Sequence, residues 1–307
     1  MNSSLRRWFY LGLLSLIWGS SFILIKKGLT GFSPIQLGSL RIVFAAIFLL
    51  FIASKSLWSI PKKLWPWVVL SGLCGSFFPS FLFAFAETKI DSATASILNA
   101  TTPLFALLLG LFLFKIRSTW MQFLGVLIGL VGTIGLIYAS SSDKANNDYA
   151  YALLVLIATF CYATNVNLIK SKLHSIPATS LATANFAVLL IPAAIIFTTE
   201  SIRMPEAFAQ FTTEVLLYVL ILGTLCTGLA LIWFNRLIQM TTPVFASSVT
   251  YTIPIVALVW GVLDGESIGW LQILSMFIVF LGVFVVQYGE RSLLKLKFLV
   301  KPAKKVG

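Results

Sequence analysis

The sequence predicts an all-α integral membrane protein whose ten transmembrane helices form two inverted five-helix repeats. Composition is the first reason: the 307 residues are 59% hydrophobic and 10% charged, whereas roughly a quarter of the residues in a soluble globule are charged. The second is that apolar runs of bilayer-spanning length, about 20 residues, recur along the whole chain. The third is that motifs of the first half return in the second.

The apolar runs follow one another with short loops between them, and aromatic residues gather at several of their ends, as interfacial anchors do. The first run is too long, and its flanks too polar, for a signal peptide, so it is expected to be the first membrane helix. The expected helices are 8–25, 34–53, 65–86, 91–114, 119–138, 150–169, 178–198, 215–235, 242–262 and 267–288.

Positive charge is distributed unequally between alternate loops. With the N-terminus assigned to the cytoplasm, sixteen of the 22 Lys and Arg residues fall on the cytoplasmic side and five on the other. Because Lys and Arg favour cytoplasmic loops, both termini are expected in the cytoplasm. The same bias explains the net charge of +12 without a nucleic-acid partner. The basic tail is expected to contact anionic membrane lipid.

Sequence motifs repeat between the halves. "LLSLIWGSSFILIK" (13–26) is similar to "LIATFCYATNVNLIK" (156–170), and "ASILNATTPLF" (95–105) to "ASSVTYTIPIV" (246–256). Five helices per half is an odd number, so the second half is expected upside down relative to the first. Inverted repeats are typical of secondary transporters, whose substrate sites lie near the midplane between the repeats. The expected units are a first repeat at 1–139, a linker at 140–149, a second repeat at 150–290 and a tail at 291–307.

Four segments resemble the EamA-type drug/metabolite transporters: "LIWGSSFILIKKGL", "PIQLGSLRIVFAA", "ASILNATTPLFALLLGLFLF" and "DGESIGWLQILSMFIVFLGVFVV". The resemblance covers about 10–138 and 150–288 as two copies of one domain. It implies a ten-helix carrier of the inner (plasma) membrane that moves small organic metabolites, often outward. The family's Glu after the fourth helix of each repeat is matched by Glu266 in the second copy. In the first copy Lys115 or Ile116 stands there, so this chain lacks the pair of acids.

Arg41 is a permanent cation within the second apolar run. An intramembrane arginine costs about 2.5–3.5 kcal/mol on insertion scales and normally faces the bundle interior. It could bind a carboxylate or phosphate of the substrate through its bidentate fork. Alternatively it is structural, satisfied by helix carbonyls or extended towards the interface. The resemblance favours the structural role, because the family carries an arginine here across carriers of unlike substrates.

Two prolines are expected to kink helices beside the substrate cavity. Pro103 frees the carbonyl of Asn99, and Pro254 that of Thr250, because proline lacks the N–H that would bond four residues back. Freed carbonyls in a membrane require protein or a water-filled cavity. The fourth and ninth helices are therefore predicted to face each other across the cavity, the alternative being ordinary kinked helices. The polar residues beside the freed carbonyls are Asn99, Thr101, Thr102, Thr250, Tyr251 and Thr252.

The first and sixth helices are expected to supply the matching wall. Trp18 of the first copy corresponds to Tyr162 of the second. Ser20 corresponds to the residue directly before Asn165. An aromatic ring with small polar groups suits an organic solute. In the alternative interpretation these residues only hold helices together.

The fifth helix carries Gly125 and Gly129 in GxxxG spacing, which lets helices approach closely. These glycines are expected to pack this helix within its own half, and a homodimer interface is the alternative. The chain is therefore expected to be a monomer or a homodimer.

Acidic residues lie near the ends of the apolar runs rather than deep within them. Because proton-coupled carriers usually need an intramembrane carboxylate or His, facilitated diffusion or exchange is expected. The sequence has no P-loop motif, catalytic cluster or metal-ligand spacing, so neither ATP hydrolysis, enzymatic activity nor a cofactor is predicted. The predicted function is export or exchange of amino acids or related metabolites by alternating access. A lipid-modifying membrane enzyme and a non-transporting receptor are the alternatives.

Overall fold

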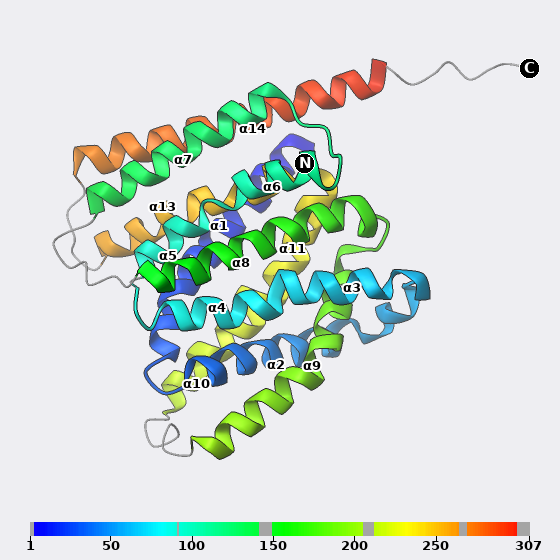
Figure 1. Cartoon of the computed structure of the whole chain (residues 1–307), viewed down its shortest axis with the longest axis vertical. Helices are drawn as coiled ribbons and strands as arrows, with labels where there is room; N and C mark the ends of the chain where they lie inside the picture. Colours follow the sequence, from blue (N-terminus) through cyan, green and yellow to red (C-terminus); the bar gives the residue numbers. More distant parts are fainter. Residues whose placement is uncertain (1–2, 91, 141–148, 205–211, 264–268, 300–307) are drawn as a thin grey trace, which may run out of the picture.

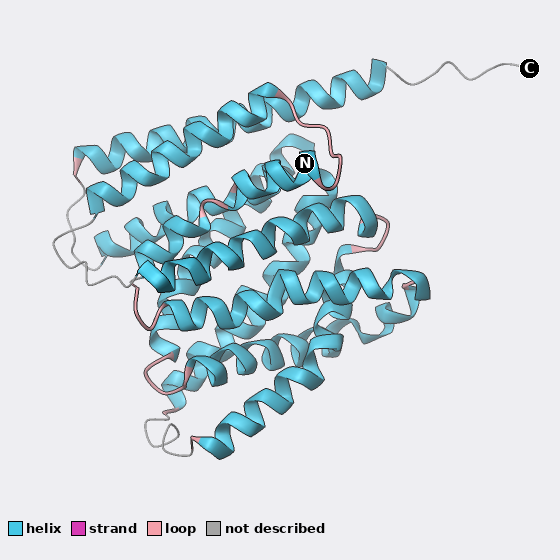
Figure 2. Ribbon diagram, viewed as in Figure 1, coloured by secondary structure: helices cyan, strands magenta, loops and turns pink. Residues whose placement is uncertain are grey.

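In the computed structural model, residues 3–90, 92–140, 149–204, 212–263 and 269–299 are described, and every regular element within them is a helix (Figures 1 and 2). The all-α prediction is thus confirmed for this part of the chain. Each of the ten apolar runs is mostly helical where it is described.

The first half begins with two uninterrupted helices. The second of them starts where the sequence dictates: Ser33 and Gln36 form a reciprocal capping box, with Pro34 in the first turn. Two short 3₁₀ helices, η1 (Ser54–Ser59) and η2 (Lys62–Leu64), lead into the third span. The membrane-type elements are α1 (Ser3–Gly28), α2 (Pro34–Ala53), α3 (Trp65–Gly72), η3 (Leu73–Phe77), α4 (Phe78–Ala86), α5 (Ser92–Asn99), α6 (Thr102–Phe112) and α7 (Trp120–Ser140).

The second half repeats this order. Its elements are α8 (Tyr149–Leu168), η4 (Ile169–Leu173), α9 (Ala178–Arg203), α10 (Thr213–Ile221), η6 (Leu222–Leu229), α11 (Ala230–Met240), α12 (Pro243–Ser247), α13 (Val249–Leu263) and α14 (Trp270–Leu299). The predicted linker at 140–149 and the predicted Glu266 match fall almost wholly outside the described residues. The beginning of the predicted tail, 291–299, continues α14 as helix.

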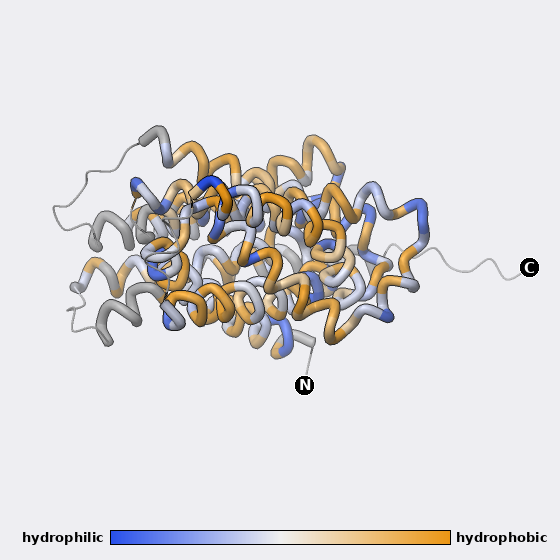
Figure 3. Tube along the Cα trace, turned by 90° about the horizontal axis from the view of Figure 1, so that it is seen from below, coloured by the Kyte–Doolittle hydropathy of each residue, from blue (hydrophilic) through white to orange (hydrophobic). Residues whose placement is uncertain are grey.

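The helices have the length and surface of a multi-pass membrane protein. Six helical runs are long and apolar enough to cross a bilayer, and four shorter apolar helices accompany them among the described residues. The number ten for the crossings stays a prediction. Large apolar side chains face outward, with Phe51 88% and Phe112 81% exposed, and hydrophobic residues run along most of the helices (Figure 3).

Two expected spans are broken rather than continuous. α5 ends at Asn99 and α6 begins at Thr102. The prediction of a kink at Pro103 within one continuous helix is therefore wrong, because the helix is interrupted before this proline. Pro103 occupies the first turn of a new helix, where its missing N–H is not needed. In the ninth span the break falls between α12 and α13, and Pro254 lies inside α13 as predicted.

The two halves pack extensively on each other. α2 lies along α9, and α7 runs beside α14 at one edge of the molecule (Figure 1). Gly125 and Gly132 leave room for α14 around Val286 and Val279, and Gly129 leaves room for the ring of Tyr251 on α13. The prediction that the glycines pack the fifth helix within its own half is therefore wrong. They join it to the other half of the same chain.

Candidate functional site

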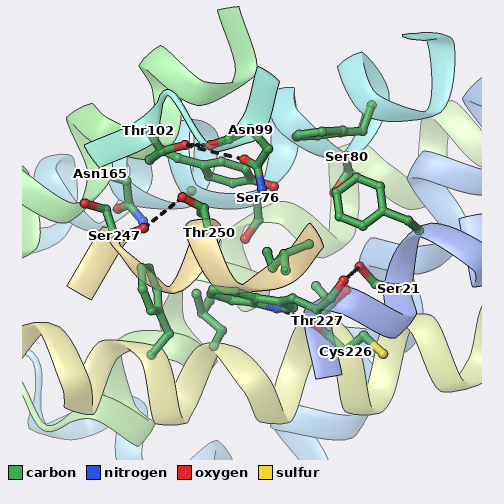
Figure 4. A pocket seen from close by; sticks show the side chains of 18 of the residues that line it. Ser21, Ser76, Ser80, Asn99, Thr102, Asn165, Cys226, Thr227, Ser247 and Thr250 are labelled. Atoms are coloured by element: carbon green, nitrogen blue, oxygen red, sulfur yellow. Dashed lines mark hydrogen bonds between the residues drawn. The ribbon is translucent and has the colours of Figure 1, made fainter. Parts of the chain in front are cut away.

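A cavity lies among the helices (Figure 4), and its space, including the part that is open to the outside, is about 840 Å³. Its described lining comes from both halves of the chain: α1, α2, η3, α4, α5 and α6 from the first, and α8, η6, α11, α12 and α13 from the second.

Seven of the nine side chains predicted to bind substrate line this cavity. They are Trp18, Arg41, Asn99, Thr102, Tyr162, Asn165 and Thr250. Ser20 and Tyr251 lie outside the lining. Ser20 donates to the carbonyl of Leu16 at 2.9 Å on its own helix.

Tyr251 is fully buried on the side of α13 that faces away from the cavity. Its hydroxyl donates to the carbonyl of Val126 at 2.9 Å, and its ring lies against Gly129. It therefore joins α13 to α7. The geometry gives Tyr251 a packing role.

Arg41 is held by a threonine from the other half of the chain. Its Nε–H donates to Thr227 Oγ1 at 2.6 Å. The Thr227 hydroxyl in turn donates to the carbonyl of Leu222 at 2.7 Å, five residues back. This longer reach is that of a π-helical turn. The turn thus aims the oxygen of Thr227 at the guanidinium.

Asn165 is oriented by a buried chain of polar groups. Its Oδ1 accepts a hydrogen bond from Ser71 Oγ at 2.7 Å, and Ser71 Oγ accepts one from Asn185 Nδ2 at 3.1 Å. The Nδ2 group of Asn165 lies against the backbone of Gly75, where a Cβ atom would fall 2.8 Å from the Asn165 amide carbon. Glycine at position 75 therefore leaves the space that this amide occupies.

Three hydroxyls of the lining donate to backbone carbonyls three residues back. Ser21 donates to the carbonyl of Trp18 at 2.7 Å, Thr102 to that of Asn99 at 2.7 Å, and Thr250 to that of Ser247 at 2.9 Å. Because their hydrogens are used, these hydroxyls offer oxygen lone pairs to the cavity. In Figure 4, Thr102, Asn165 and Thr250 lie on one side, and Ser21 and Thr227 on another.

Aromatic rings form the apolar wall. Trp18 is fixed by a 2.9 Å hydrogen bond from its indole N–H to the carbonyl of Cys226, and its ring meets Phe234 edge-on at 4.8 Å between centroids. Tyr162 stacks on Phe83 at 6.1 Å, and Phe83 also meets Phe22 at 5.9 Å. These contacts hold the rings in place, so the wall is largely preformed.

Sequence reasoning missed the contribution of the third and eighth spans. Each contains a π-helical stretch, and these bring Gly75 and Ser76 from η3 and Cys226 and Thr227 from η6 to the cavity. A signal existed in the matching strings "LSGLCGSFF" (70–78) and "LGTLCTGLA" (222–230). π-Helical turns recur at functional sites, in agreement with this position.

Arg41 is the charged residue of the described lining, and the remaining lining residues there are neutral. Among the residues searched, no group of three or more His, Cys, Asp or Glu residues could hold a metal ion. The described lining is therefore polar and aromatic, with Arg41 as its one charged residue.

Comparison with known proteins identifies relatives along nearly the full chain. The EamA-like transporter family model matches residues 7–138 and 150–288. An "Uncharacterized transporter" of Archaeoglobus fulgidus is 25% identical, covering 92% of this chain and 99% of its own. The "Uncharacterized inner membrane transporter YedA" of Escherichia coli K12 is 27% identical, covering 90% and 89%. A "Probable amino-acid metabolite efflux pump" of Salmonella typhimurium is 23% identical, covering 91% and 94%.

A solved crystal structure shares the fold, with a TM-score of 0.70 at 18% sequence identity, over 92% of this chain and 97% of the other. Together with the two copies of the family pattern and the multi-pass helical bundle, this leads to one conclusion. The chain belongs to the EamA-like transporter family of membrane proteins.

Proposed function

We propose that this protein moves small organic metabolites, amino acids or related compounds, across the inner (plasma) membrane by export or exchange, with the cavity as its substrate site. The observation that carries the proposal is a cavity built from both halves of the chain. Its aromatic wall and hydrogen-bonding groups suit a solute with an apolar body and a polar end. A relative named as an amino-acid metabolite efflux pump supports this substrate range.

Reciprocal contacts between the halves support alternating access. α1 packs on α13 as α8 packs on α6, and α1 packs on α10, η6 and α11 as α8 packs on α3, η3 and α4. The helices that contact α1 in one half are thus the equivalents of the helices that contact α8 in the other half. When each half adopts the conformation that the other half had, the same site opens first to one side of the membrane and then to the other. The inverted orientation and the cytoplasmic placement of both termini are part of the proposal.

The experiment uses purified protein in liposomes loaded with a whole-cell metabolite extract. Mass spectrometry follows the solutes that leave, compared with protein-free liposomes. We expect selective loss of a few small organic solutes, with no requirement for a pH gradient, because the described lining has no carboxylate or histidine to carry a proton. Retention of every solute by folded, inserted protein would count against transport. Uptake against a concentration gradient driven by pH alone would count against exchange.

Two neighbouring residues of α13 allow the effect of a residue that lines the cavity to be compared with that of a residue that only packs behind it. Thr250→Val removes a cavity oxygen, and we expect slower efflux of the selected solutes. Tyr251→Phe removes the bond to Val126, and we expect unchanged efflux with a loss of about 1 kcal/mol in stability. Efflux rates and thermal unfolding of both variants check this. Slow efflux from a well-folded Tyr251→Phe variant would place the hydroxyl in the transport path.

A further inference from the structure

The net charge of the residues that line the cavity indicates which charge its solute should have. Arg41 contributes one positive charge, and the other described lining residues contribute none. A cation in the membrane interior costs about 2.5–3.5 kcal/mol even on insertion scales. The described lining therefore bears an uncompensated charge, which favours a solute that neutralises it.

The structural interpretation of Arg41 leaves most of its donors unused. A guanidinium has five N–H groups, and the described residues accept one hydrogen bond from it, at Thr227. Helix carbonyls, which the structural role requires, do not accept from Arg41 within the described part of the chain. The terminal amino groups, which form the bidentate fork for a carboxylate, remain for a solute in the cavity.

Thr227 fixes the direction of this fork. Its hydrogen is committed to Leu222, so its oxygen accepts from Nε and cannot donate to the solute. With Nε held, the guanidinium plane is set by the π-helical turn of η6. This arrangement is a positioned anion site rather than a loose cation.

The other side of the cavity is polar but uncharged. Thr102 and Thr250 offer hydroxyl oxygens, because their hydrogens bond to the backbone carbonyls of Asn99 and Ser247. Asn165 offers its Nδ2 hydrogens, because Ser71 occupies its Oδ1. These groups suit a hydroxyl, carbonyl or amide of the solute. An ammonium would find dipoles there and no carboxylate among the described lining residues.

We propose that the cavity selects organic monoanions: a carboxylate binds the Arg41 fork, an apolar or aromatic body lies against the Trp18 and Tyr162 rings, and an uncharged polar group meets Asn165 and Thr250. This inference rests on the proposed function and narrows it. A monoanion leaves the chamber neutral, whereas a zwitterionic amino acid leaves its positive charge uncompensated. Acids with a hydroxyl, oxo or acylamino group are therefore preferred to free amino acids.

The test compares solutes that share one skeleton and differ in charge: phenyllactate as the monoanion, phenylalanine as the zwitterion and phenylethylamine as the cation. Binding to purified protein is measured by calorimetry, and exchange by counterflow in proteoliposomes. We expect phenyllactate to bind at least ten-fold more tightly than phenylalanine, with phenylethylamine weakest. Equal or tighter binding of phenylalanine would overturn the inference.

Variants assign the preference to its residues. Arg41→Gln is expected to abolish the ten-fold difference, and Arg41→Lys to keep part of it, because lysine retains the charge without the fork. Thr227→Val frees Nε and should weaken phenyllactate alone. Thr224→Val is the matched control: Thr224 lies on the same π-helical stretch, outside the lining, and bonds to Leu220. An equal loss of all three solutes in folded Arg41→Gln protein would make Arg41 structural and overturn the inference.

Failure of the inference and failure of the proposed function look different. Counterflow of phenylalanine without charge preference retains transport and overturns the monoanion site. Charge-selective binding without counterflow of any solute retains the site and overturns transport. If the Arg41→Gln variant does not fold, the inference is tested by the ratio of phenyllactate to phenylalanine binding in the wild type and by the effect of Thr227→Val on that ratio.

Discussion

Gly282→Val is expected to yield little or no correctly folded protein. A Cβ atom at position 282 would lie 2.6 Å from the Cα of Gly129 and 2.8 Å from the carbonyl oxygen of Gly125. These are backbone atoms of α7, so relief requires the two helices to separate. Overpacking of a core costs typically about 1–3 kcal/mol even where side chains can adjust, and here they cannot. Size-exclusion profiles and thermal unfolding in detergent measure the effect.

Gly12→Val is the control for this substitution. Gly12 lies on α1, and a Cβ atom there meets nothing within 4 Å. The control is expected to elute and unfold like the wild type, although both changes replace a helical glycine by the same β-branched residue. Wild-type behaviour of the Gly282→Val protein would refute the close contact between α7 and α14.

Lys170→Met is expected to loosen the end of α11. The Lys170 ammonium donates to the carbonyls of Ile238 at 3.2 Å, Gln239 at 3.4 Å and Thr241. The last carbonyls of a helix have no partner within it, and a cation there satisfies them. Hydrogen bonds to charged groups contribute about 1.5–3 kcal/mol each. We therefore expect amide hydrogen exchange in 236–242 to accelerate at least ten-fold, as measured by mass spectrometry.

Lys172→Met serves as the comparison for this change. Lys172 is two residues away, is exposed, and places its ammonium 5.6 Å from the centre of the Trp67 ring. Its removal should leave exchange in 236–242 at the wild-type rate. Equal acceleration in both variants would mean that general charge, rather than the three carbonyl contacts, stabilises this end of α11.

The course of the helices was largely predictable from the sequence. The apolar run expected at 34–53 coincides with α2, whose start Ser33 and Pro34 fix locally. The matching strings at 70–78 and 222–230 mark the two π-helical stretches as equivalent, but their π-helical form was not predictable, because the wider turn leaves the apolar pattern of a membrane helix unchanged. The break before Pro103 was missed for a similar reason: both pieces are apolar, and together they have the length of one span.

The errors at the site are errors of helical phase. Ser20 and Tyr251 were predicted to line the cavity, and their neighbours Ser21 and Thr250 do so. Adjacent residues of an α-helix point about 100° apart, so one of two neighbours commonly faces elsewhere. An all-apolar surrounding gives no amphipathic stripe to set that phase. The partner of Arg41 was beyond reach, because Thr227 lies 186 positions away in the sequence.

Of the partners in the Lys170 contact, mutation can remove only the lysine side chain. All three acceptors are backbone carbonyls, which every amino acid carries, so an exchange of side chain at 238, 239 or 241 leaves them chemically intact. Variation in the strength of this contact must therefore arise chiefly at codon 170. A mutational scan of the chain should find 170 intolerant while its three partner positions accept varied residues as far as their own packing permits.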